Sequence, residues 1–220
     1  MSEADSAHGG DTVGTHEFTV AGSRTVYDGA ILSLRVDDVR MPGGQAAERE
    51  VVEHFGAVAV MARDDTGRIA MIRQYRHPIG RRLLEIPAGL LDAGPGESAL
   101  DAARRELAEE VDLAADRWRV LVDLDLSPGF TDEALRLYLA EGLRTLDAAE
   151  RHDEEADLSV EWLDLDDAVT RVLGGEIVNA TAVAGILALA AVDRGGVEVR
   201  DIDAPWTDEP TALRDRRSRR

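Results

Sequence analysis

Three glutamates lie close together near the middle of the sequence, in the run from Arg105 to Glu110. If this run is helical, Glu106, Glu109 and Glu110 are related by i, i+3 and i+4 and share one face. Neighbouring carboxylates repel one another by about 0.2–0.5 kcal/mol per pair even on an exposed helix. The face is therefore either solvated, which is the commoner case for an acidic helix, or it binds cations. Carboxylate oxygens with room for water suit Mg²⁺ or Mn²⁺.

The sequence around the glutamates predicts the helix that must carry them. Leu100, Ala103, Leu107 and Val111 recur at helical spacing, which predicts an amphipathic helix over about 98–111. Strands and two more helices are predicted around it. The strands cover 57–62 and 69–75, joined as a hairpin through 63–67, then 119–126, 134–140 and 159–163; the helices cover 166–173 and 179–192. This order predicts an α/β domain with an α/β/α layered architecture.

The chain divides into four predicted segments. These are a flexible tail over 1–16, an N-terminal β region over 17–52, a main domain over 53–195 and a second flexible tail over 196–220. The β region is indicated by short apolar runs with turn signals at Asp28-Gly29 and Pro42-Gly43-Gly44. The first tail is polar and acidic, and the second mixes Pro, Asp and a basic terminus without a period.

Composition excludes several classes of function. The chain has 44 acidic and 25 basic residues, a net charge of −19, which disfavours nucleic acids and anionic membranes as partners. The sequence contains no cysteine, so disulfides and thiolate metal sites are excluded. No apolar run reaches the roughly 18–20 residues of a membrane helix, and the first residues do not resemble a secretory signal. We therefore expect a cytoplasmic protein.

The glutamates belong to a longer pattern. Glu97 precedes Arg105 by eight positions, giving E-x7-R-E-L-x-E-E, with Leu113 three residues after Glu110 and Leu-Glu-Ile-Pro-Ala-Gly at 84–89. This resembles the Nudix hydrolase signature, G-x5-E-x7-R-E-U-x-E-E-x-G-U, in which U is aliphatic. The resemblance implies a Nudix-type α/β/α sandwich with a mixed β-sheet. It also implies hydrolysis of a nucleoside diphosphate linked to another group.

Two positions depart from the signature. Seven residues rather than five separate Gly89 from Glu97, and Asp112 replaces the closing glycine. The insertion lies in a Gly/Pro loop, where extra length costs little. Asp is one of the few residues that can adopt the left-handed conformation of a helix-ending glycine. Neither change removes a carboxylate, so activity is still expected.

The resemblance assigns roles to individual residues. Glu106 and Glu110 would be the main Mg²⁺ ligands, with Glu109 assisting and the carbonyl of Ala88 supplying a further oxygen. Mn²⁺ could substitute for Mg²⁺. Arg105 would orient the glutamates through charge-assisted hydrogen bonds. Glu97 has a structural reading as well, because a carboxylate at a helix start complements the dipole.

Three segments resemble the ADP-ribose pyrophosphatase branch of this family. They are Arg-Gln-Tyr-Arg at 73–76, Ser-Pro-Gly-Phe-Thr-Asp-Glu at 127–133 and the acidic run at 152–158. In that run Glu154 best matches the glutamate that activates the attacking water, with Glu155 close behind. The resemblance also implies substrate contacts at Arg49, Arg76, Gly89, Leu90 and Glu133.

The implied activity is Mg²⁺-dependent hydrolysis of ADP-ribose to AMP and ribose 5-phosphate. The resemblance also implies a homodimer paired through the N-terminal strands, in which Arg49 reaches the other subunit's site. Alternatives remain open at this point. The substrate could be an ADP-sugar, NADH or a dinucleoside polyphosphate; the chain could be a Nudix-fold nucleotide sensor without activity, or an acidic interaction protein.

Overall fold

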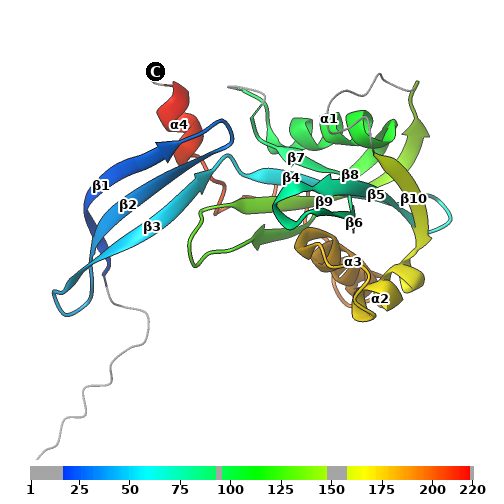
Figure 1. The fold of residues 1–220 in the computed structure, drawn as a ribbon. Helices are drawn as coiled ribbons and strands as arrows, with labels where there is room; N and C mark the ends of the chain where they lie inside the picture. The colour runs from blue at the N-terminus through cyan, green and yellow to red at the C-terminus, as the bar shows by residue number, and fades with distance from the viewer. Residues whose placement is uncertain (1–16, 93–95, 148–157, 219–220) are drawn as a thin grey trace, which may run out of the picture.

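The computed structural model describes residues 17–92, 96–147 and 158–218. Figure 1 shows a body of sheets and helices from which an N-terminal sheet projects. That sheet is an antiparallel meander of β1 (Thr19–Asp28), β2 (Leu32–Arg40) and β3 (Ala46–His54). Both predicted turns connect its strands, and Gly43 and Gly44 take positive φ in the second.

Two further sheets form the body. The four-stranded sheet has the order β7-β4-β9-β8 and is mixed, because β4 and β9 run parallel while the other pairs are antiparallel. Its strands are β4 (Ala57–Ala62), β7 (Ala88–Leu90), β8 (Leu113–Asp125) and β9 (Ala134–Thr145). The three-stranded antiparallel sheet has the order β10-β5-β6. Its strands are β5 (Arg68–Arg76), β6 (Arg81–Glu85) and β10 (Ser159–Asp164), and a short 3₁₀ helix (His77–Ile79) links β5 to β6.

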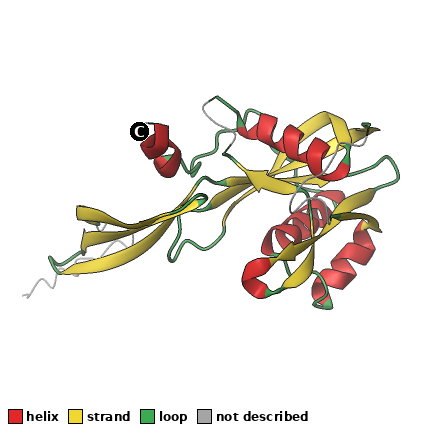
Figure 2. Cartoon of the chain, turned by 45° about the horizontal axis from the view of Figure 1, so that its top comes forward, coloured by secondary structure: helices red, strands yellow, loops and turns green. Residues whose placement is uncertain are grey.

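Helices cover both sides of these sheets, which confirms the predicted α/β/α sandwich (Figure 2). They are α1 (Ala99–Val111), α2 (Leu165–Leu173) and α3 (Ala180–Asp193), whereas the short α4 (Ala212–Ser218) contacts β3 of the N-terminal sheet. Strand β4 separates two cores: Ala59 and Met61 face the core that includes α3, whereas Val58 and Val60 face the core beneath α1. In the described parts of the chain, no helix combines the length and apolar character needed to span a membrane.

The predicted hairpin between 57–62 and 69–75 is wrong. Strands β4 and β5 belong to different sheets, and a single bridge between Arg63 and Ile69 joins them locally. Every residue of β4 is buried, so this strand has no polar face that marks a sheet edge. Its partners are β9 and β7, and the turn after it redirects the chain to the second sheet.

The C-terminal segment also differs from the predicted flexible tail. Arg200 forms a backbone bridge with Val120 of β8, and Leu213 of α4 is fully buried. Trp206 packs against the core beneath α1. The segment is anchored by single, widely spaced residues, which leave no periodic pattern in the sequence.

Asp64 closes the turn between β4 and β5. Its Oδ1 accepts hydrogen bonds from the backbone N–H groups of Thr66 and Arg68, both at 2.9 Å, and from the Thr66 hydroxyl at 2.7 Å. Its Oδ2 accepts one from Nη2 of Arg68 at 2.8 Å. Burial opposes the charge, but the hydrogen bonds outweigh it and lower the pKa of Asp64 to about 2.

Replacing Asp64 by alanine is expected to lower the free energy of unfolding by about 1 kcal/mol at pH 7, because the turn loses these acceptors. The folded-state pKa is depressed, so the stabilisation is present above the unfolded pKa of about 3.9 and is lost as the pH falls towards about 2. Urea unfolding of both proteins at several pH values measures this. A difference that stays constant down to the lowest pH would contradict it.

Candidate active site

Helix α1 has the start and the end that the sequence predicts. The hydroxyl of Ser98 accepts a hydrogen bond from the backbone N–H of Asp101 at 3.1 Å, which caps the first turn. Asp112 follows the last turn with φ 55° in the left-handed region, where the signature has glycine. The replacement of that glycine therefore preserves the geometry that ends the helix.

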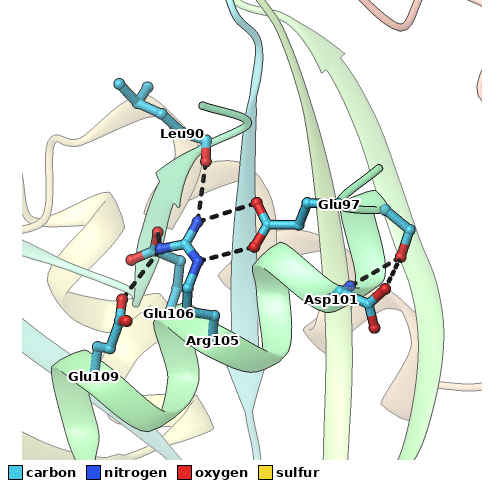
Figure 3. A network of polar contacts seen from close by, with 7 residues as sticks. Leu90, Glu97, Asp101, Arg105, Glu106 and Glu109 are labelled. Atoms are coloured by element: carbon cyan, nitrogen blue, oxygen red, sulfur yellow. Dashed lines mark hydrogen bonds and ion pairs between the residues drawn. The ribbon is translucent and has the colours of Figure 1, made fainter. Parts of the chain in front are cut away.

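Arg105 is the centre of a polar network on the same helix (Figure 3). Its guanidinium donates to Glu97 through Nε at 2.9 Å, and through Nη1 to Glu106 at 2.5 Å and Glu109 at 3.1 Å. Its Nη2 also reaches the carbonyl oxygen of Leu90 at 3.4 Å. The hydrogen bond to Glu97 is the largest of the effects that raise the pKa of Arg105 above its usual value, against the opposing effect of burial. Arg105 is therefore a permanent cation that offsets the repulsion among the glutamates.

Glu106 and Glu110, two of the predicted ligands, lie against the backbone of β7. The carboxylate of Glu106 occupies the space where a side chain at Gly89 would be: a methyl group there would lie 1.9 Å from Oε1 of Glu106. Oε2 of Glu110 accepts a hydrogen bond from the backbone N–H of Ala88 at 2.9 Å. Both glutamates are buried. The Pro-Ala-Gly segment thus contacts two carboxylates, and a side chain at position 89 would displace that of Glu106.

The donor set suits a hard divalent cation, because it consists of carboxylate oxygens next to the carbonyl of Ala88. Within the described residues, however, no three metal-ligating side chains converge on one point. Glu106 and Glu109 bind Arg105, and Glu110 accepts a hydrogen bond from a backbone N–H. The structure brings the predicted ligands together on one face but directs them to protein partners.

Arg76 forms an ion pair that the sequence analysis did not include. Its Nε and Nη2 donate to the two oxygens of Glu85 at 3.0 and 2.7 Å, and the Glu85 side chain is almost fully buried. This bidentate geometry fixes the plane of the guanidinium. A glutamate directly after two leucines was the available signal for a buried charged residue.

The remaining predicted residues lie elsewhere. Arg49 is on β3 of the projecting sheet, where it contacts the carbonyl oxygen of Glu48 at 2.9 Å. It lines a cavity of about 360 Å³ between this sheet and the loop at 127–133. Glu133 lies at the end of the same loop, 3.6 Å from Nδ1 of His54. These contacts of Arg49 and Glu133 do not involve the glutamates of α1. Glu154 and Glu155 lie outside the described residues.

Comparison with known proteins decides the family. The sequence model of the NUDIX domain matches residues 53–182, and that of the nucleoside diphosphate sugar hydrolase N-terminal domain matches residues 18–52. The chain belongs to the Nudix family. The resemblance predicted from the sequence is confirmed, and with it the assignment as a Nudix hydrolase of nucleoside diphosphate compounds.

Individual relatives agree with this assignment. The Nudix hydrolase is 55% identical over 205 residues to the ADP-ribose pyrophosphatase of Mycobacterium tuberculosis, covering 93% of this chain and 99% of the relative. It is 39% identical over 164 residues to the ADP-ribose pyrophosphatase of Bacillus subtilis, covering 74% and 87%. A crystal structure of an ADP compounds hydrolase matches with a TM-score of 0.70 at 23% identity, over 81% of this chain and 95% of that one, and shares the fold.

Proposed function

We propose that this Nudix hydrolase is a cytoplasmic ADP-ribose pyrophosphatase that requires Mg²⁺, for which Mn²⁺ can substitute. The reaction would cut ADP-ribose into AMP and ribose 5-phosphate. The observation that carries the proposal is the 55% identity to an ADP-ribose pyrophosphatase over 99% of that relative's length. The glutamates and the Ala88-Gly89 backbone are in keeping with it, because they place oxygen donors beside one another on a rigid helix and strand.

In this proposal Glu106, Glu109 and Glu110 would hold the cations with the carbonyl of Ala88. Bound cations would neutralise the pyrophosphate and make a bound water more acidic. Arg105 keeps Glu106 and Glu109 aligned through hydrogen bonds from its Nη1. It would give up part of this hydrogen bonding when the two carboxylates bind cations.

Substrate contacts come from residues outside the helix. Arg76 would contact phosphate or the terminal ribose, with its guanidinium held by Glu85. The backbone at Gly89 and Leu90 would lie against the diphosphate, and Glu133 would contact the substrate from the neighbouring loop. Glu154 is the proposed base that activates water, with Glu155 as the second candidate.

The test is hydrolysis of a compound panel with Mg²⁺, followed by phosphatase-coupled detection: ADP-ribose, ADP-glucose, NADH, diadenosine polyphosphates and 8-oxo-dGTP. We expect ADP-ribose to be turned over well ahead of the others, and the Glu106→Gln variant to be slower by at least about 100-fold on all of them. Faster turnover of another compound would keep the chemistry and reject ADP-ribose as the substrate. Ligand binding without any turnover would favour a sensor.

We also propose that the protein is a homodimer paired through the N-terminal sheet. Large apolar side chains are exposed on β1 and at its ends: Phe18, Val20, Val26, Tyr27 and Ile31. Such a group marks an interaction surface, and pairing there would bring Arg49 towards the other subunit's site. Light scattering is expected to give twice the chain mass for the wild type and a larger monomer fraction for Val26→Glu. A wild-type monomer at working concentration would reject the dimer.

A further inference from the structure

Residues 199–218 are called here the C-terminal strap. They run from β8 of the four-stranded sheet to the N-terminal sheet and end in α4 (Figure 1). They lie beyond both regions that the family models match. We propose that the strap holds the N-terminal sheet in its position relative to the Nudix domain. Arg216 and Arg217 are the positioning residues that make this connection.

The strap begins with firm attachments to the Nudix domain. Arg200 and Val120 exchange two backbone hydrogen bonds, at 3.1 and 3.2 Å. Arg136 of β9 is almost fully buried and donates to the carbonyl oxygens of Ala204 at 2.8 Å and Pro205 at 3.0 Å. The same guanidinium lies over the ring of Trp206, 5.1 Å from its centroid.

Asp123 joins the two arginines of this attachment. It accepts hydrogen bonds from Arg136 at 2.8 and 3.0 Å and from Arg200 at 2.8 Å. Burial opposes the charge, but the hydrogen bonds from these guanidinium groups outweigh it and hold the pKa of Asp123 below its usual value. The first half of the strap is therefore held to β8 and β9 by an ion-pair network, in which Asp123 of β8 joins Arg136 of β9 to Arg200 of the strap.

The middle of the strap packs against the connection between the two parts. Gly56, which follows β3, has φ +81°, and a methyl group there would lie 3.0 Å from the ring of Pro210. Leu213 of α4 is fully buried. The strap therefore packs closely against the connection between the two parts.

Arg217 attaches the end of the strap to the β1–β2 turn. Its guanidinium lies over the ring of Phe55, 4.7 Å from the centroid. It donates to the carbonyl oxygen of Ala30 at 2.6 Å and also to that of Gly29. A planar guanidinium can make both bonds at once while it stacks on the ring, which an ammonium cannot do.

Arg216 completes a buried charge cluster on the N-terminal sheet. Glu53 of β3 and Asp37 of β2 are almost fully buried. Arg35 pairs with both of them, with Nε 2.9 Å from Oε1 of Glu53, and Arg216 pairs with Glu53 from the strap. Two carboxylates thus face two guanidinium groups. Without Arg216 the cluster has one uncompensated buried negative charge, which is costly.

The loop at 127–133 supplies a second attachment, at the end of β3. The N–H of Val52 donates to the carbonyl oxygen of Phe130 at 2.8 Å, and the N–H of Asp132 donates to that of Val52 at 3.2 Å. This loop carries Glu133 and the sheet carries Arg49, so the strap, by holding the sheet, would set the position of Arg49 relative to Glu133. The effect on substrate-binding residues rests on the proposed function, whereas the attachment of the N-terminal sheet by the strap does not.

The test compares Arg216→Ala/Arg217→Ala with the wild-type full chain. Hydrogen–deuterium exchange over 29–54 is expected to rise by about tenfold or more, while exchange in α1 and β4 stays unchanged. KM for the hydrolysed substrate should rise several-fold, because the binding residues on the sheet lose their position. The kcat value should stay within about twofold, because the glutamates of α1 keep theirs. Arg214→Ala is the matched control, since Arg214 pairs with Glu209 within the strap itself.

The Arg217→Lys variant separates a positioning role of Arg217 from an effect on overall stability. Arg217→Lys keeps the charge over Phe55 but not the fork to two carbonyl oxygens, so it should restore protection only in part. Unchanged exchange over 29–54 in the double alanine variant would overturn the proposal, as would faster exchange throughout the body. The exchange measurement needs no substrate, so its outcome is independent of whether ADP-ribose is hydrolysed.

Discussion

Replacing Glu110 by glutamine is expected to lower kcat by at least about 100-fold. The amide oxygen can still accept the hydrogen bond from the N–H of Ala88, so the contact between α1 and β7 is retained. What is lost is a buried negative charge that would face the cations. The measurement is steady-state hydrolysis at increasing Mg²⁺, together with thermal unfolding.

The matched control is Asp101→Asn. It removes one negative charge from the first turn of the same helix, where Asp101 interacts with Ser98 and Arg104 rather than with β7. Its kcat should stay close to that of the wild type. Equal losses in the two variants would mean that the charge of the helix as a whole matters, and would remove Glu110 from the site.

Replacing Gly89 by alanine is expected to have an effect of similar size, about 100-fold on kcat, because a displacement of about 1 Å at a reacting centre can cost that much. The added methyl group would overlap the carboxylate of Glu106, at 1.9 Å from Oε1. The carboxylate must then turn away from β7. Because Gly89 does not have positive φ, the backbone itself accepts alanine and the protein should still fold.

A double-mutant cycle tests whether this effect acts through Glu106. In a Glu106→Gln background, Gly89→Ala should cause little further loss, since the group that it displaces is already inactive. Losses that multiply across the two substitutions would show that Gly89 acts independently, through the backbone that faces the substrate.

Much of the geometry of the candidate site could be predicted because it is local in sequence. Helix spacing alone places Glu106, Glu109 and Glu110 on one face, and Ser98 and Asp112 mark both ends. The structure adds the partners that spacing cannot reveal. Arg105 was expected to orient the glutamates, but its bond to the carbonyl of Leu90 depends on how β7 meets α1.

The fold was predicted as a set of elements more successfully than as a set of contacts. Strand pairing between β4 and β9, whose partner residues are 78 positions apart, depends on packing across the whole domain, and the buried β4 sequence carries no alternation that would identify its neighbours. The C-terminal strap was missed for a related reason. Arg136, Trp206 and Leu213 contact distant parts of the chain one at a time, whereas sequence patterns reveal repeated contacts.

The division of the core by β4 bears on how this enzyme can change over time. Helix α1 rests on Val58 and Val60, whereas α3 packs on the opposite side around Ala59 and Met61. Substitutions beneath α1 act directly on the helix that carries the glutamates. Substitutions beneath α3 reach the glutamates only through β7, whose Ala88 and Leu90 pack against that core. One strand thus gives the domain two faces that differ in how directly a substitution reaches the glutamates.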